Sequence, residues 1–584
     1  MGVSSAVFES AGKRTEHYVP GVYSRSYNVT SPSGISSGNL CILGKSTGGK
    51  PHTLLEFSSL AEAKDSLVSG ELLEGVGYAF NGSDDYVPQK VYAMRVNTGT
   101  QSTCTLSSGD TEVLKLSSWD YGSHTNQLKI WVQTGSTTNS KKITTVFKDN
   151  TVEVDDIIRE SLSLSYVGEG ENPTVTVTNE AITMTATVTT TDDDGNETSE
   201  DDTLTISFDD VDTIEELVTR INDSSSFSAT SLESDSDAEI ELDTVTNVDI
   251  ADETVLYSNF QAVVDALEDN EYIGEGNVEI LSDNNRVVPD DTDGYVYFSD
   301  GSAGSYTTSE WSDALEALEK EDVQIIATPV TTASIQNLIA THCKTMSSTV
   351  NRKERTCLLG GALDESDTTG IARAKALASK YASYVVDSAT VTNPISGDSE
   401  EVGGAILAIM LAGMESGMSV NEPLTNKTLS VLGFSTIRSI SNMEKLIKAG
   451  VMVCNPNPDD ITSYVCIRAI TTYQGSGDLI SCERSMTRED LYMNRDLRNR
   501  FASSIGRPNA GKTSTIIQTL KDAAKEWANM GYIIPSDSGD NVWDIKVSVD
   551  ADKNYLTFSR YLTAPTNFIF ITAINKTYSS TVEV

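Results

Sequence analysis

One stretch of this chain has the residue types and the spacing of a phosphate-binding loop. The segment GRPNAGKT matches the pattern GxxxxGK[ST], with Gly506, Gly511, Lys512 and Thr513 at the fixed positions. In such a loop the glycines let backbone N–H groups surround a phosphate, the lysine reaches the terminal phosphates and the hydroxyl holds magnesium. Nucleotide binding is therefore the first chemistry to weigh.

The sequence on either side of this segment does not fit a nucleotide site. A phosphate-binding loop directly follows a buried strand and opens a nucleotide-binding domain. Here residues 491–505 predict a charged helix, and only 71 residues follow Thr513. Pro508 and Asn509 are typical of a turn between two helices. We therefore interpret the match as accidental and expect no bound cofactor.

The remaining side chains point to no catalytic or metal site. Segments 192–197 and 290–294 are rich in Asp, but their flanks predict strands and their spacing does not fit an EF-hand. We interpret both as solvated turns and leave loose calcium binding open. The seven cysteines are scattered without a CxxC pair, and the four histidines are dispersed. Because no HExxH motif occurs either, we expect no enzyme.

Composition excludes further classes of function. A chain of 584 residues exceeds the size of one core, so several domains are expected. The 42 basic and 85 acidic residues give a net charge of -43, which disfavours a phosphate backbone and hence nucleic acid as a partner. No apolar run reaches the ~18 residues of a membrane span, and the N-terminus has no apolar signal core. We expect neither membrane insertion nor export.

Much of the negative charge lies in one stretch. Residues 191–260 contain 22 acidic residues and a single basic residue, Arg220. Around them the sequence alternates polar and apolar residues at period two, as in TVTVTNEAITMTATVTTT. The pattern predicts an acidic all-β insertion over 104–275.

Apolar strands alternate with helices on both sides of this insertion. That alternation predicts a mostly parallel sheet covered on both faces. We expect one α/β domain made of 29–103 and 276–475, from which the insertion protrudes. The expected strands include 40–44, 91–96, 323–329 and 356–363, and the expected helices include 58–67, 311–320, 372–383, 405–418 and 442–450.

The last hundred residues change character and predict an α+β domain over 476–574. Helices are expected over 491–505 and 513–531, followed by strands that end with NFIFITAI at 567–574. Residues 484–530 hold nine bases and five acids. This region is therefore mildly basic in an otherwise acidic chain.

Several segments, in order, resemble one protein family. The phrase YVPGVY at 18–23 is similar to the PGVY entry of contractile tail sheath proteins. Further segments resemble the same family, namely CILGKSTGGKP (41–51), VYAMRVN (91–97), FSDGSAG (298–304), NEPLTNK (421–427), KLIKAGVMVCNPN (445–457) and DLRNRFASSIGRPN (496–509). Because of these segments, the chain resembles the contractile tail sheath proteins of myovirus-type bacteriophages. The resemblance is to the sheath proteins of large phages with Gram-positive hosts.

The resemblance implies a structural role. Such proteins polymerise as stacked hexameric rings into a helical sheath around the tail tube, and contraction drives the tube through the host envelope for genome ejection. The implied partners are further copies of the chain, the tail tube protein, and the baseplate and tail terminator proteins. The implied location is the tail sheath of the virion, after assembly in the host cytoplasm.

Both chain ends suit strand addition, in which an extended segment donates backbone hydrogen bonds to a sheet edge on a neighbour. We predict an N-terminal arm over 1–28 and a C-terminal arm over 575–584. The predicted strand-exchange residues are Tyr18, Val19, Val22, Tyr23, Tyr578, Val582 and Val584.

The charge distribution suggests an orientation for the assembled subunit. We hypothesise that the basic helix with Arg495, Arg498 and Arg500 faces the tube, and that the acidic insertion faces outward. Two alternatives stay open. A P-loop NTPase of a phage assembly machine requires ATP binding that Lys512→Ala removes, and a surface adhesin built on the insertion requires an export signal.

Overall fold

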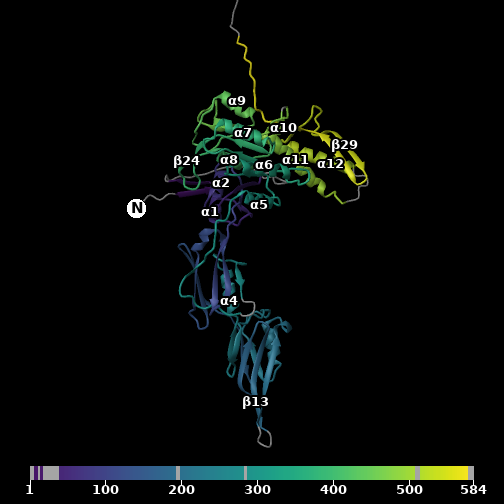
Figure 1. The fold of residues 1–584 in the computed structure, drawn as a ribbon. Helices are drawn as coiled ribbons and strands as arrows, with labels where there is room; N and C mark the ends of the chain where they lie inside the picture. The colour runs from purple at the N-terminus through teal and green to yellow at the C-terminus, as the bar shows by residue number, and fades with distance from the viewer. Residues whose placement is uncertain are drawn as a thin grey trace, which may run out of the picture. The chain divides into compact units, whose positions relative to one another are not determined.

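The computed structural model describes residues 6–10, 13–17, 38–191, 197–281, 286–475, 477–506 and 513–575. The chain forms two compact units (Figure 1). Unit 1 comprises Met1–Thr98 and Ser305–Val584, and unit 2 comprises Gly99–Gly304. Near the N-terminus, β1 (Ala6–Ser10) and β2 (Lys13–His17) pair as an antiparallel hairpin.

Unit 1 is built on a six-stranded sheet in the order β22-β21-β20-β3-β5-β4. Every neighbouring pair is parallel except β5 and the edge strand β4. The strands are β3 (Leu40–Gly44), β4 (Leu54–Phe57), β5 (Val91–Arg95), β20 (Ile325–Ala327), β21 (Thr356–Gly360) and β22 (Ala382–Val385). Strands such as LCILG are buried throughout because a parallel sheet is covered on both faces. The predicted mixed α/β character is confirmed.

Helices cover both faces of this sheet. Leu40 and Ile42 of β3 belong to the core shared with α2 and α8, whereas Cys41 and Leu43 belong to the core shared with α5 and α6. This division follows from the alternation of side chains along a strand. The helices of unit 1 up to this point are α1 (Leu60–Leu67), α2 (Glu71–Phe80), α5 (Thr308–Leu318), α6 (Ala333–Met346), α7 (Asp367–Leu377), α8 (Gly404–Ser416) and α9 (Ile440–Lys448).

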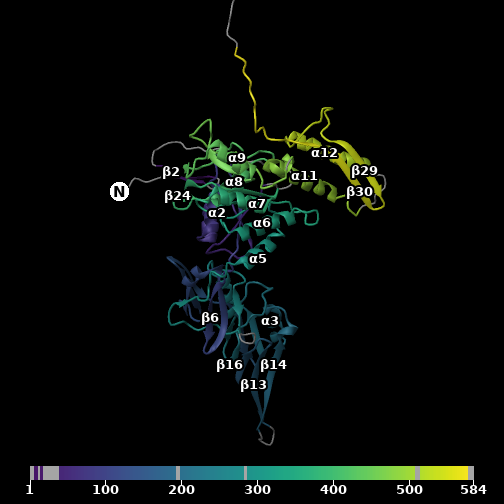
Figure 2. The same ribbon diagram turned by 45° about the horizontal axis from the view of Figure 1, so that its top comes forward.

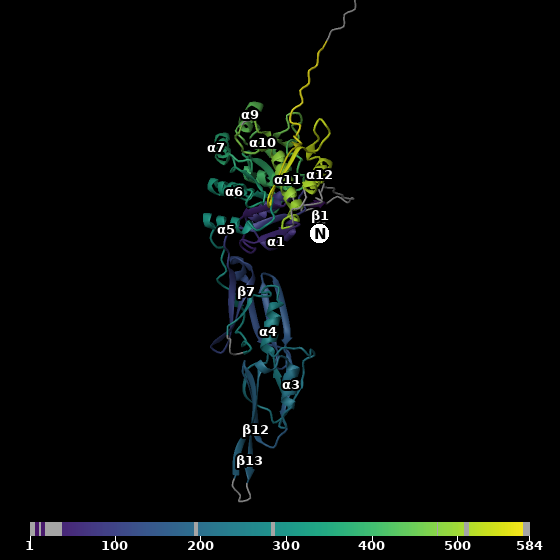
Figure 3. The same cartoon turned by 90° about the vertical axis from the view of Figure 1, so that its right-hand side faces the viewer.

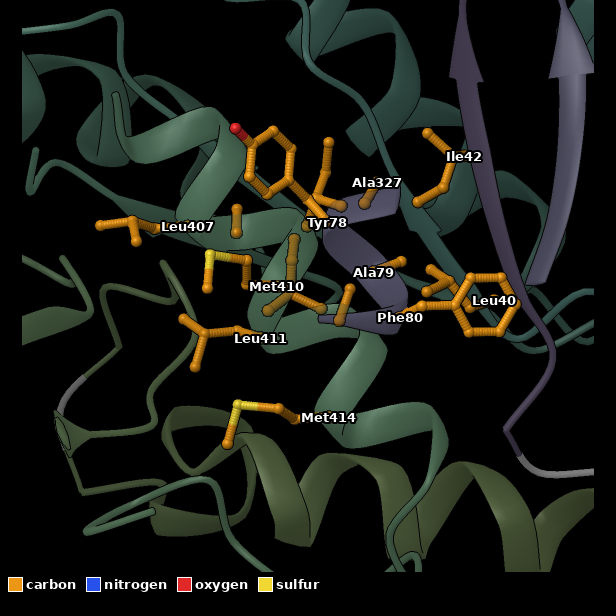
Figure 4. Packing of buried hydrophobic residues seen from close by; sticks show 14 of the residues in the cluster. Leu40, Ile42, Tyr78, Ala79, Phe80, Ala327, Leu407, Met410, Leu411 and Met414 are labelled. Atoms are coloured by element: carbon orange, nitrogen blue, oxygen red, sulfur yellow. The ribbon is translucent and has the colours of Figure 1, made fainter. Parts of the chain in front are cut away.

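Helices α2 and α8 approach each other closely in the first of these cores (Figure 4). Tyr78 and Phe80 of α2 and Met410 of α8 are buried side chains of this core. A Cβ atom on Gly413 would lie only 2.0 Å from the backbone oxygen of Ala79. The missing side chain is therefore what lets the two backbones come so near.

The predicted helix over 372–383 lies too far along the chain, since α7 begins five residues earlier and ends six residues earlier. Helix α7 ends at Leu377 because Ala378 takes the left-handed conformation, with φ 38° and ψ 47°. The chain then enters β22, the edge strand at the opposite end of the sheet from β4. Smaller antiparallel sheets follow, made of β23 (Ala389–Thr392), β24 (Ser399–Val402) and β25 (Gly433–Phe434), and of β26 (Val453–Pro456) and β27 (Tyr464–Arg468).

The C-terminal part of unit 1 combines helices with short antiparallel sheets (Figure 2). Helix α11 begins seven residues before the predicted start at 491, whereas α12 closely matches the predicted 513–531. Met493, Leu520 and Trp527 are buried between these elements. The elements are α10 (Leu479–Cys482), α11 (Arg484–Ala502), α12 (Thr513–Asn529), β28 (Ile533–Ile534), β29 (Trp543–Asp550), β30 (Lys553–Ser559) and β31 (Tyr561–Leu562).

Unit 2 is rich in strands but is not all-β, so that prediction was wrong. Its described residues include two α-helices, α3 (Ile214–Asn222) and α4 (Asn259–Glu268), each of which packs against strands (Figure 3). Leu217 and Ile221 of α3 are buried in one core, and Phe260 and Leu267 of α4 in another. The unit also spans Gly99–Gly304, which is wider than the predicted 104–275.

The strands of unit 2 form four antiparallel sheets among the described residues, in the orders β10-β9-β8-β19, β15-β11-β17, β14-β13-β12-β16 and β18-β7-β6. Two short 3-10 helices, η1 (Ser123–Gln127) and η2 (Phe208–Asp210), lie between strands. The strands are β6 (Gln101–Ser108), β7 (Thr111–Tyr121), β8 (Lys129–Thr134), β9 (Lys141–Phe147), β10 (Asn150–Ile157), β11 (Glu160–Tyr166), β12 (Glu171–Val177), β13 (Ala181–Thr191), β14 (Glu197–Ser207), β15 (Phe227–Ser231), β16 (Val245–Asp249), β17 (Thr254–Tyr257), β18 (Val278–Ile280) and β19 (Val296–Tyr297).

Candidate interaction surfaces

The loop that resembles a phosphate-binding motif lies between two helices. Helix α11 precedes Gly506, and Thr513 is the first residue of α12. Gly511 and Lys512 lie outside the described residues. Since a phosphate-binding loop requires a strand directly before its first glycine, the preceding helix removes the context that the motif needs.

The described residues also contain no candidate metal site and no candidate membrane-spanning helix. No group of three or more His, Cys, Asp or Glu side chains suited to a metal occurs in the described part of the chain. None of the helices described for this chain is both long and apolar enough to cross a bilayer.

An apolar segment at the C-terminal end of the described chain lies unpaired. Phe568, Ile569, Phe570, Ile571 and Ile574 are 65% to 92% exposed. They belong to NFIFITAI, which was predicted to be a strand but forms none in the structure. The yellow trace in Figures 1 and 3 shows this segment running away from the rest of unit 1. A contiguous apolar patch of this kind marks a surface that another chain covers.

The rings of Phe568 and Phe570 stack with centroids 6.2 Å apart. Contact between residues two apart is expected of an extended chain, whose alternate side chains share a face. This stacking is the arrangement that an extended strand would give to its alternate side chains. We call residues 568–574 the apolar arm.

The hairpin of β29 and β30 is an incomplete sheet. It contains two strands and no third strand among the described residues. Ile545, Leu556 and Phe558 pack one face against the core with α12, while Val549 and Tyr555 stay about half exposed. A two-stranded ribbon is marginally stable by itself, and its outer edges present unpaired backbone groups.

A buried ion triad attaches α11 to the central sheet. Arg484 donates two hydrogen bonds of 2.7 Å to the carboxylate of Glu415 on α8, and Arg488 lies 3.4 Å from the same carboxylate. Arg484 also donates to the backbone oxygen of Cys357 and to Ser383, on strands β21 and β22. Both members of the bidentate pair are almost completely buried. This triad could not be predicted from the sequence, because Glu415 lies about 70 residues from the two arginines.

The three arginines predicted to face the tube are each paired within the chain. Arg495 binds Asp322, Arg498 binds Glu354, and Arg500 binds both Asp496 and Glu526. Their side chains are 20% to 33% exposed. The helix is therefore less positive at its surface than its sequence suggests.

The arm residues predicted from the sequence lie outside the described part of the chain. Those residues are Tyr18, Val19, Val22, Tyr23, Tyr578, Val582 and Val584. Their role stays a prediction. The apolar arm, which the structure does describe, lies directly before the predicted C-terminal arm at 575–584.

Glu489 on α11 is a completely buried carboxyl group. Burial raises the pKa of Glu489 to about 8, although Arg488, the backbone N–H of Thr563 and Arg560 act in the opposite direction. The folded protein thus favours the protonated form. The contribution of Glu489 to the free energy of unfolding is fully present below the ordinary glutamate pKa. It is lost as the pH rises through about 8.

Glu489→Gln is expected to remove this alkaline loss. Between pH 6 and pH 9 the free energy of unfolding should fall by roughly 2–3 kcal/mol more in the unsubstituted protein than in the variant. Denaturant unfolding at several pH values measures the difference. Glu444→Gln, at a side chain that is 61% exposed, is the matched control and should leave the pH profile unchanged.

Comparison with known proteins gives these surfaces their context. Residues 304–472 match the family model of the phage tail sheath protein central domain. These residues resemble a phage tail sheath protein. It is 26% identical to the tail sheath protein of Bacillus phage SP01, over 96% of this chain and 95% of that protein. It is 25% identical to the tail sheath protein of Staphylococcus phage Twort, over 76% of this chain and 78% of that protein.

A solved structure supports the fold of this sheath chain. A sheath tail protein from Listeria innocua superposes with a TM-score of 0.55 at 12% identity, covering 92% of this chain and 96% of that one. At this identity the likeness concerns the fold alone. The likeness to tail sheath proteins identifies the chain as a structural, non-enzymatic component of a virion tail sheath, as predicted from the sequence.

Proposed function

We propose that this sheath protein polymerises as stacked hexameric rings around a tail tube and contracts to drive the tube through the host envelope for genome ejection. The apolar arm is the observation that carries the proposal. A soluble subunit gains nothing by exposing five large apolar side chains in one short segment, whereas a polymer buries them at every contact between subunits.

The proposed contact between subunits is strand addition. The arm of one subunit pairs with an open edge of the β29–β30 hairpin in the next, and its alternate side chains cover the half-exposed apolar residues of that hairpin. Burial stabilises such a contact by about 1.5–3 kcal/mol for each large apolar side chain that becomes fully buried. The N-terminal arm at 1–28 is proposed to add a further strand in the same way.

A contact of this kind is heterologous, because the arm and the hairpin edge are different surfaces of one chain. Heterologous contacts between identical subunits close into rings or continue as helices. The arms then hold neighbours together while the folded bodies move between two packings. The energy of contraction is proposed to reside in the extended lattice, so that no nucleotide is consumed.

Charge supports an outward position for unit 2. Its sequence holds 44 acidic and 8 basic residues, a net charge of -36 out of the -43 of the whole chain. Like charges repel less where solvent and salt screen them. We therefore propose that unit 2 faces away from the tube in the assembled sheath.

The basic face of α11 is still proposed to lie toward the tube, but its intramolecular ion pairs change how the idea is tested. Arg495→Glu, combined with Asp322→Arg, reverses the partners while keeping the pair within the chain. We expect the double variant to keep its melting temperature and to assemble at least tenfold less on tail tubes. Equal assembly by co-sedimentation with tubes would contradict the proposed orientation.

The tail tube, baseplate and tail terminator proteins are the proposed partners besides further copies of the chain. Negative-stain microscopy of the purified protein tests the proposed function most simply. Tubular polymers are expected. Particles that stay monomeric at high concentration and beside tail tubes would overturn the proposal.

A further inference from the structure

The C-terminal segment is attached to the rest of unit 1 at several points before it becomes the apolar arm. Arg560 donates to Asp490 at 2.8 Å, and the hydroxyl of Thr563 donates to the backbone oxygen of Gly531 at 2.6 Å. Farther along, the side-chain amide of Asn567 donates to Glu483 at 3.0 Å. The chain therefore runs along the buried first half of α11 toward its N-terminus.

Glu483 is the last point of attachment. Its side chain is 1% exposed, and the oxygen that accepts from Asn567 also accepts two hydrogen bonds from Arg468, at 3.1 and 2.6 Å. The guanidinium group of Arg468 lies over the ring of Phe568, 5.5 Å from its centroid. One buried carboxylate thus links the body, through Arg468, to Phe568, the first residue of a stretch that is exposed throughout from 568 to 575.

We propose that Glu483, Arg468 and Asn567 form a clamp, with Glu483 as the positioning residue that fixes where the apolar arm leaves the body. This inference rests on the proposed function of the arm in assembly. An arm whose root is fixed approaches the neighbouring hairpin from a restricted set of directions. Because the free arm then has fewer conformations to lose, the entropic cost of binding is lower.

The clamp can be opened without disturbing the core. Asn567→Ala removes the hydrogen bond from the arm but leaves Glu483 paired with Arg468, so no buried charge is left alone. A hydrogen bond to a charged group changes an equilibrium by about 10- to 100-fold. Thr566→Ala, at the exposed neighbouring position, is the matched control.

Spin labels at Ile571 and at Lys521 on α12, in a Cys482→Ser background, report the freedom of the arm by electron–electron distance measurement on the soluble subunit. The labelled protein with an intact clamp should give a narrow distribution. Asn567→Ala should at least double its width, and Thr566→Ala should not. An unchanged width in Asn567→Ala would overturn the clamp.

Assembly of the same variants, without labels, separates the clamp from the proposed function. Asn567→Ala is expected to need about tenfold more protein to form tubes than Thr566→Ala. A broadened distribution with unchanged assembly would overturn the positioning role. If the unsubstituted protein itself forms no tubes, the proposed function fails, while the distance measurement still decides whether the clamp exists.

Discussion

Replacement of Phe568, Phe570 and Ile574 by Ser is expected to abolish polymerisation while leaving the soluble subunit folded. These side chains are 65%, 92% and 80% exposed, so the subunit loses no contact with its body except that of Phe568 with Arg468, and its melting temperature should change little. In the polymer, each lost burial costs about 1.5–3 kcal/mol. Sedimentation and negative-stain microscopy measure the outcome, which should be the absence of tubes at concentrations where the unsubstituted protein polymerises.

The matched control uses apolar residues that are equally exposed elsewhere. Ile437 and Ile440 are 72% and 66% exposed, and their replacement by Ser should leave assembly intact. If the arm variant still forms tubes, or if the control variant fails equally, the arm has no special part in the contact.

Glu415→Ala is expected to lower the free energy of unfolding by about 3–5 kcal/mol. The substitution leaves Arg484 and Arg488 buried without their carboxylate, and the cost of burying an uncompensated charge exceeds the worth of the lost ion pair. Because the triad joins α8 to α11, the C-terminal part of unit 1 should detach first. Denaturant unfolding and hydrogen exchange of α11 measure both effects.

The pH dependence of this triad has a definite sign. Burial acts to raise the pKa of Glu415, but Arg484 and Arg488 outweigh burial and lower it. Stability from this group is present above the ordinary glutamate pKa and is lost as the pH falls through the lowered value. Glu444→Ala removes an exposed pair with Lys448 and should change stability by less than about 1 kcal/mol. A small effect of Glu415→Ala would contradict the role assigned to the triad.

Features set by local pattern could be predicted from the sequence. Apolar runs such as LCILG marked strands of the central sheet, and the periodicity of 513–531 marked α12 almost to the residue. The flanking sequence also argued correctly that a helix, and no strand, precedes Gly506. In each case the residues that predict the element lie within a few helical turns or a single strand.

Features set by contacts between distant segments could not be predicted. Glu415 and Arg484 meet only after the sheet forms, and Arg495 finds Asp322 across 173 residues. Helix α3 lies in a sequence dominated by acidic and strand-forming residues. Its apolar stripe of Ile214, Leu217 and Ile221 is too short to predict a helix in that context. The segment 567–574 has strand propensity but no partner in its own chain, so propensity alone gave the wrong assignment.

Reconstruction of the assembled protein by electron cryomicroscopy tests the central claim most directly. The claim predicts that residues 568–574 form a strand hydrogen-bonded to the edge of the β29–β30 hairpin of a neighbouring subunit. A polymer in which this segment stays solvent-exposed, or folds back onto its own subunit, would contradict it.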